Sequence, residues 1–84
     1  MVTEIYHLNP GMYVKTGEIQ RLRRITSGRS HKSWTPQDEA KRAISAGFIT
    51  APGNYAIVKY SPAYLDTMEM HHVSVGIDSK LVVL

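Results

Sequence analysis

Apolar side chains recur along this chain with two different periods, and the segment from Thr35 to Gly47 has the period of a helix. Ala40, Ala43 and Ile44 share one face at helical spacing, while the residues between them are charged or polar. Because this apolar face is narrow and mostly alanine, we expect the helix to lie close against a flat partner such as a β-sheet.

The ends of this segment carry matching start and stop signals. Thr35 is suited to act as N-cap, and Asp38 three residues later can complete a capping box. Pro36 falls at the first helical position, where its missing N–H costs nothing. Gly47 can adopt the left-handed conformation that often ends a helix. Together these signals predict a helix over residues 35–47.

Alternation with a period of two predicts β-strands on both sides of the helix. The clearest strand runs from Tyr55 to Tyr60, and Val73, Val75 and Ile77 alternate with smaller or polar residues in a second. Further strands are expected at residues 3–8, 12–15 and 80–84, with turns at residues 9–11, 51–54 and 78–79.

Three segments are less clearly determined by the pattern. Residues 18–26 place apolar side chains at spacing three, which favours a helix, but two of them also share a strand face, and we favour a strand. Residues 61–68 can form a short helical turn or open a loop. Residues 27–33 are polar and contain glycine, so we expect a loop there.

Strands followed by one helix and then more strands indicate the α+β class, with an antiparallel sheet and the helix packed on one face. Phe48 and Ile49 are candidates for its core, and the apolar residues 81–84 should be buried or paired. Eighty-four residues favour a single domain over residues 1–84. The lack of cysteine, of a run of about 20 apolar residues and of a signal-peptide pattern favours a soluble, cytoplasmic protein.

Positive charge is concentrated in one part of the chain. The net charge of +3 divides into +5 between Lys15 and Lys32 and −2 elsewhere. Such a local excess attracts a polyanion or an acidic protein surface, although it can also serve only to keep a strand face and a loop solvated. The candidate partner-binding residues are Arg21, Arg23, Arg24, Arg29, His31, Lys32 and Trp34.

Trp34 has two interpretations, since it lies between the basic segment and the helix. As a structural residue it would be a hydrophobic staple that packs on the first helical turn or on the sheet edge. As a functional residue it would stack on a base or anchor a protein partner. Replacement by alanine would unfold the domain in the first case and weaken binding in the second.

Catalytic and ligand-binding chemistry has little support in the sequence. Tyr13, Arg29 and His31 could be imagined as a cluster that cuts RNA, but any small basic protein offers such a trio. His71 and His72 are neighbours, so on a strand they would point to opposite faces and could not easily hold one metal. No glycine-rich nucleotide motif occurs. We therefore expect a non-enzymatic protein without metal or cofactor.

Between residues 9 and 58 the chain combines a turn tripeptide, an alanine-rich helix and the start of a strand. The residues concerned are Asn9-Pro10-Gly11, Tyr13, Gly47 at the helix end, Pro52, Asn54-Tyr55 and Ile57. This layout resembles that of small phage-encoded anti-CRISPR proteins directed at type I CRISPR-Cas systems. The resemblance implies a non-enzymatic inhibitor that binds a Cas protein or a crRNA-guided complex, and it assigns no role to individual residues.

Our leading hypothesis is a small, non-enzymatic binding protein of phage type that inhibits a host nucleoprotein complex. The alternative is a nucleic-acid-binding accessory protein that uses the basic segment 15–32 on phosphates. A structural protein of a virion is a third possibility. An exposed edge strand near residues 80–84 would also permit a homodimer.

Overall fold

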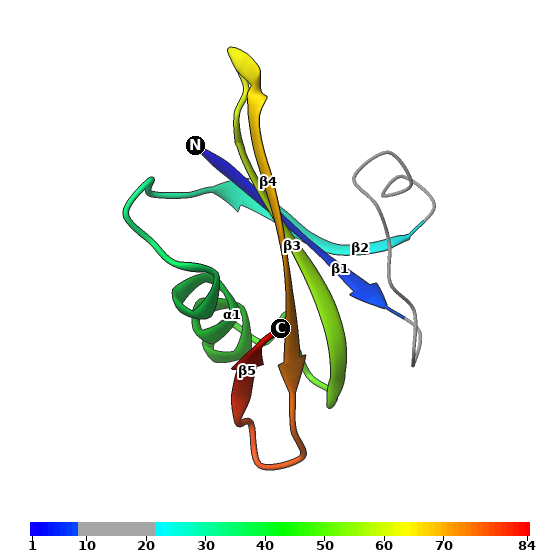
Figure 1. Cartoon of the computed structure of the whole chain (residues 1–84). Helices are drawn as coiled ribbons and strands as arrows, with labels where there is room; N and C mark the ends of the chain where they lie inside the picture. Colours follow the sequence, from blue (N-terminus) through cyan, green and yellow to red (C-terminus); the bar gives the residue numbers. More distant parts are fainter. Residues whose placement is uncertain (9–21) are drawn as a thin grey trace.

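The computed structural model describes residues 1–8 and 22–84, which form a five-stranded antiparallel sheet and one α-helix (Figure 1). The predicted α+β class is confirmed. The strands lie side by side in the order β2-β1-β3-β4-β5. In chain order the elements are β1 (Val2–Leu8), β2 (Arg23–Arg29), α1 (Pro36–Ser45), β3 (Gly53–Ser61), β4 (Tyr64–Val75) and β5 (Leu81–Val83).

The predicted caps of α1 are confirmed. The Asp38 amide donates to the Thr35 hydroxyl at 3.2 Å, and the Thr35 amide donates to the Asp38 carboxylate at 2.9 Å, which completes the capping box. The hydrogen bond from the Thr35 backbone, followed by that from its side chain, holds the pKa of the Asp38 carboxyl below its usual value. Gly47 has a φ of 82°, so it leaves the helix through the left-handed region that glycine tolerates best.

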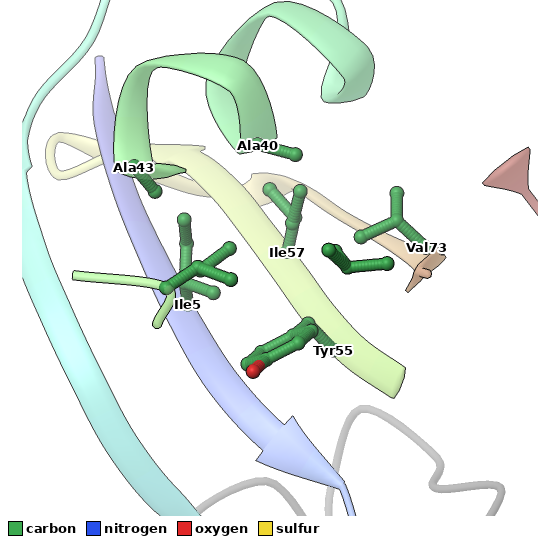
Figure 2. Packing of buried hydrophobic residues seen from close by; sticks show 8 residues of the cluster. Ile5, Ala40, Ala43, Tyr55, Ile57 and Val73 are labelled. Carbon is green, nitrogen blue, oxygen red and sulfur yellow. The ribbon is translucent and has the colours of Figure 1, made fainter. Parts of the chain in front are cut away.

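Short side chains bring α1 close to the sheet, as its alanine-rich face predicts. The helix packs on one face, over β3, β4 and β5. Ala40 and Ala43 point from the helix toward Ile5 and Ile57 on the strands beneath (Figure 2). The buried cluster on this face consists of Ile5, Ala40, Ala43, Ile49, Tyr55, Ile57, Val73 and Val75.

A second buried cluster occupies the other face of the sheet. Its members are Tyr6, Leu8, Ala56 and Val58, which alternate along β1 and β3 with the residues that face the helix. β3, the central strand, therefore buries apolar side chains on both faces from Tyr55 to Val58.

The spacing of three that made residues 18–26 ambiguous has a simple explanation in β2. Ile25 packs against the cluster beneath the helix, whereas Leu22 packs against the cluster on the opposite face. The preferred strand is confirmed from Arg23 onward. The pairing with β1 shifts by one residue between Ile5 and Tyr6, so the strand is irregular where Ile25 lies. The predicted turn at residues 9–11, the strand at 12–15 and residues 18–21 lie outside the described residues.

Two predictions about connections are wrong. The expected loop at residues 27–33 begins only after Arg29, because Gly28 and Arg29 pair with Thr3 and Val2 as an extension of β2. Backbone pairing needs no apolar side chain, so the polar composition did not reveal it. Residues 61–68 form neither a helical turn nor an open loop, since β3 ends at Ser61 and β4 begins at Tyr64 after a tight turn.

Two apolar residues also lie elsewhere than predicted. Phe48 is 52% exposed, whereas its neighbour Ile49 is buried as expected. Ile77 is 93% exposed because β4 ends at Val75 and the chain turns there. The last strand is confirmed as β5, which pairs with β4, although the side chains of Val82, Val83 and Leu84 are exposed.

Within residues 1–8 and 22–84, the structure has no helix long and apolar enough to cross a membrane.

The Glu4 carboxylate links β1 to its two neighbours on the face opposite the helix. It accepts hydrogen bonds from the Tyr6 hydroxyl and, at 2.8 Å, from the Tyr60 hydroxyl, and it lies 3.8 Å from an Arg24 guanidinium nitrogen. Burial, with further contributions from Glu4, raises the pKa of Tyr6 to about 12. The hydrogen bond to Glu4 also raises the pKa of Tyr60.

Removal of the N-cap should weaken α1. We expect Thr35→Ala to lower the free energy of unfolding by about 1 kcal/mol, because an amide of the first turn loses its acceptor. Urea denaturation followed by circular dichroism would measure this loss. Thr50→Ala, at an exposed position outside the helix, is the matched control and should change stability by less than about 0.5 kcal/mol.

Alkaline pH should destabilise the fold through Tyr6. Its pKa is about 12 in the folded protein and near the ordinary value of 10.0 when unfolded, so the folded state holds the proton more tightly. The stabilisation is complete below pH 10 and is lost as the pH rises toward 12. Tyr6→Phe should flatten this decline in denaturation experiments. An unchanged slope would mean that Tyr6 ionises equally in both states.

Candidate functional site

A buried ion pair fixes the connection between β2 and α1 against the sheet. Lys59 lies on the helix-facing side of β3 and is 8% exposed, and Glu39 in the first part of α1 is 6% exposed. The Lys59 ammonium nitrogen lies 3.4 Å from a Glu39 carboxylate oxygen. The same nitrogen donates to the backbone carbonyl of Trp34 at 2.8 Å and to that of His31.

The Lys59 ammonium thus makes two hydrogen bonds to backbone carbonyl groups and one ion pair. The Glu39 carboxylate also accepts a hydrogen bond from the Ser30 hydroxyl. Both buried charges are therefore paired, which is the condition under which a protein tolerates them. As a result, the segment from Ser30 to Trp34 is bound to the sheet at several points.

Trp34 is half-buried, and its indole ring contacts the side chains of Arg42 and His31. The guanidinium carbon of Arg42, from the second half of α1, lies 3.5 Å from the centre of the Trp34 ring. The His31 ring lies 5.9 Å from it at 36°. A cation over an indole face is a favourable arrangement. Trp34 therefore contacts α1 through Arg42, which lies beyond the first turn.

The predicted partner-binding residues fall into two groups at opposite ends of β2. Arg23 and Arg24 lie at its start, and Arg29 lies at its end. β2 is seven residues long, so its two ends lie roughly 20 Å apart. Arg24 is further engaged by Glu4. The second group contains Arg29, His31, Lys32 and Trp34, while Arg21 lies outside the described residues.

Two cations that the sequence analysis missed complete the second group. Lys41 and Arg42 are exposed on α1, and both line a shallow depression that also includes Trp34. The sequence pattern assigned Lys41 and Arg42 to the polar face of the helix. It did not show that this face of α1 lies next to the connection between β2 and α1. We call the resulting area the Trp34 surface. It consists of Arg29, His31, Lys32, Trp34, Lys41 and Arg42.

Trp34 also lines two other cavities. The first, of about 330 Å³, lies between α1 and β2, and Arg29, Arg42 and Phe48 line it as well. The second, of about 290 Å³, lies next to the Lys59–Glu39 pair, with Lys32 and His71 among its lining residues. The charged side chains of the Trp34 surface therefore surround indentations in the protein.

The histidines of the described residues are spread over β1, the β2–α1 connection and β4. His71 and His72 lie on opposite faces of β4, as predicted, because they pair with Ile57 and Ala56. Burial, and then the neighbouring His71, lowers the pKa of His72. His31 Nδ1 lies 2.6 Å from the Ser33 hydroxyl. Among residues 1–8 and 22–84, no three His, Asp or Glu side chains group in a way that could hold a metal ion.

Comparisons with models of known protein families, with curated proteins and with solved structures find no match for this chain. The assignment of a function therefore rests on the geometry and electrostatics of the Trp34 surface.

Removal of the Lys59 charge should strongly destabilise the protein. We expect Lys59→Met to cost about 3–5 kcal/mol, because Glu39 would remain as an unpaired buried charge. The double variant Lys59→Met/Glu39→Leu should recover most of this loss. Urea denaturation followed by circular dichroism and by the fluorescence of Trp34 would measure both. Lys80→Met, at an exposed position, is the control; a Lys59→Met variant as stable as this control would contradict the assigned role.

Proposed function

We propose that this protein is a non-catalytic binding protein that uses the Trp34 surface to engage and inhibit a host nucleoprotein complex. The main support is the gathering of four cationic side chains and His31 around Trp34, whose backbone carbonyl accepts a hydrogen bond from Lys59. A nucleoprotein complex presents phosphates and acidic protein surfaces, and both attract such a cluster.

The fixed position of the Trp34 surface suits binding. The carbonyl groups of His31 and Trp34 are held by Lys59, and the Trp34 ring is covered by Arg42. A side chain that is already ordered loses little conformational freedom when a partner binds. Aromatic and arginine side chains at the centre of an interface also contribute most of the binding energy in many complexes.

Three carboxylates lie near this surface. Glu39 is paired with Lys59, Asp38 accepts from the Thr35 amide and attracts Lys41 and Arg42, and Glu69 lies 3.5 Å from His71. Among the described residues, no ion pair within 4.0 Å engages Arg29, Lys32 or Lys41, so these side chains can contact a partner. The resemblance to anti-CRISPR proteins suggests the particular target, a Cas protein or a crRNA-guided complex, and we include that target in the proposal.

Affinity capture from a bacterial lysate, with and without nuclease, would test the proposal. A defined protein complex that stays bound after nuclease treatment would support it, and mass spectrometry would identify the target. Loss of all partners after nuclease treatment would instead indicate a protein that binds nucleic acid by itself, which is the alternative function.

Charge reversal should locate the binding surface. We expect Lys32→Glu/Lys41→Glu to reduce capture of the complex about tenfold, because both side chains lie beside Trp34. The control, Arg23→Glu/Lys80→Glu, changes the net charge equally at exposed positions away from Trp34. Equal losses in both variants would show that only the overall charge matters and would refute a localised site.

A further inference from the structure

The groove between α1 and β2 exists because the helix lies toward the β5 edge of the sheet and not over the β2 edge. α1 packs over β3, β4 and β5. The helix-facing side of β2 consequently borders a groove of about 330 Å³, which is large enough for a small ligand. Its floor comes from β1 and β2, and its walls come from α1 and the segments that flank the helix. The lining includes Thr3, Ile5, Thr26, Gly28, Trp34 and Phe48.

The floor of this groove contains an unsatisfied polar group. Thr3 is 6% exposed, and its hydroxyl oxygen has no hydrogen-bond partner in the described part of the chain. A buried hydroxyl without a partner costs about 1–3 kcal/mol, so the floor of the groove is not optimised for the stability of the fold alone. Thr3 pairs with Gly28 on one side and with Lys59 on the other. One row across the sheet therefore connects the groove to the buried ion pair.

Gly28 leaves the floor open. A Cβ atom added at this position would meet no other atom within 4 Å. Larger residues normally occupy strand positions, because glycine has no side chain to pack and loses more entropy on folding. The space above Gly28 is therefore part of the groove rather than a packed region of the protein.

The walls combine aromatic rings with positive charge. Trp34 and Phe48 line the groove together with Arg29 and Arg42, and Phe48 is 52% exposed. Its one acidic lining residue in the described chain, Glu39, is paired with Lys59. Aromatic faces that stack on bases and cations that contact phosphates are the usual components of a site for single-stranded nucleic acid.

We propose that this groove binds a segment of single-stranded nucleic acid, with a base stacked on Phe48 above the open floor at Gly28 and the adjacent phosphates contacted by Arg29 and Arg42. This inference rests on the proposed function and identifies the part of the nucleoprotein complex that the surface contacts. An extended peptide is less compatible with the groove, because a peptide supplies no regular row of negative charges to match two arginines.

Binding of a short fluorescent oligothymidylate, measured by anisotropy, would test the proposal on the intact protein. Gly28→Val extends a side chain that suits a strand into the groove, and its Cβ atom would meet no other atom within 4 Å. We expect it to weaken binding at least tenfold while the melting temperature is maintained. Ser74→Val introduces the same side chain into β4, away from the groove, and should bind like the wild type.

Further variants and ligands would distinguish the groove from a simple basic surface. Phe48→Ala should weaken binding about tenfold through the loss of stacking. Arg29→Gln should reduce the slope of log affinity against log salt by about 0.7, the value for one phosphate of a single strand. Equal affinity for a duplex, or normal binding by Gly28→Val, would overturn the groove assignment. A mononucleotide that binds as tightly as the oligonucleotide would indicate a nucleotide pocket instead.

The oligonucleotide-binding experiment and the capture experiment can fail independently of each other. If no oligonucleotide binds while a nuclease-resistant protein complex is still captured through Lys32 and Lys41, the groove proposal is wrong and the proposed function stands. If the oligonucleotide binds through the groove but no protein complex is captured, the inhibitor function is wrong.

Discussion

Burial of the Lys59 charge is the constraint on which the candidate site depends. A lysine on the helix-facing side of a central strand requires a counter-ion and additional acceptors, and Glu39 and the carbonyl groups of His31 and Trp34 provide them. The helix and the connection before it are therefore fixed relative to the sheet. A well-packed apolar residue could stabilise this position equally well, but it would not attach the segment that carries Trp34.

The alanine face of α1 and the displacement of the helix act together. Ala40 and Ala43 let the helix lie close to Ile5 and Ile57, so a small helix closes the core without covering β2. The uncovered part of the sheet then lies next to the fixed Trp34. One surface thus acquires both a depression and a set of cations, although the residues involved come from β1, β2, α1 and the segments between them.

Local sequence signals predicted the helix and most strands, because caps and alternation depend on residues close in the chain. Thr35, Asp38 and Gly47 determine the helix ends through such contacts. The alternation of Tyr55, Ile57 and Lys59 also placed a lysine on an apolar face, which was a signal of a buried charge, but its partner is 20 residues earlier and could not be identified. The contribution of Arg42 and the opening of the groove depend on how the helix sits on the sheet, which no local pattern specifies. For the same reason, the basic segment seemed continuous, whereas β2 separates Arg23 from Arg29.

The position of β1 between β2 and β3 has a consequence for the order in which the chain folds. Val2 pairs with Tyr60 and Leu8 with Asn54, so β1 pairs with a strand that lies about 50 residues later in the chain. By contrast, β3 and β4 form a hairpin through a tight turn and need no distant segment. Contacts between residues far apart in sequence slow folding. We therefore expect the β3–β4 hairpin to form early and β1 to insert afterwards between β2 and β3, which completes the sheet.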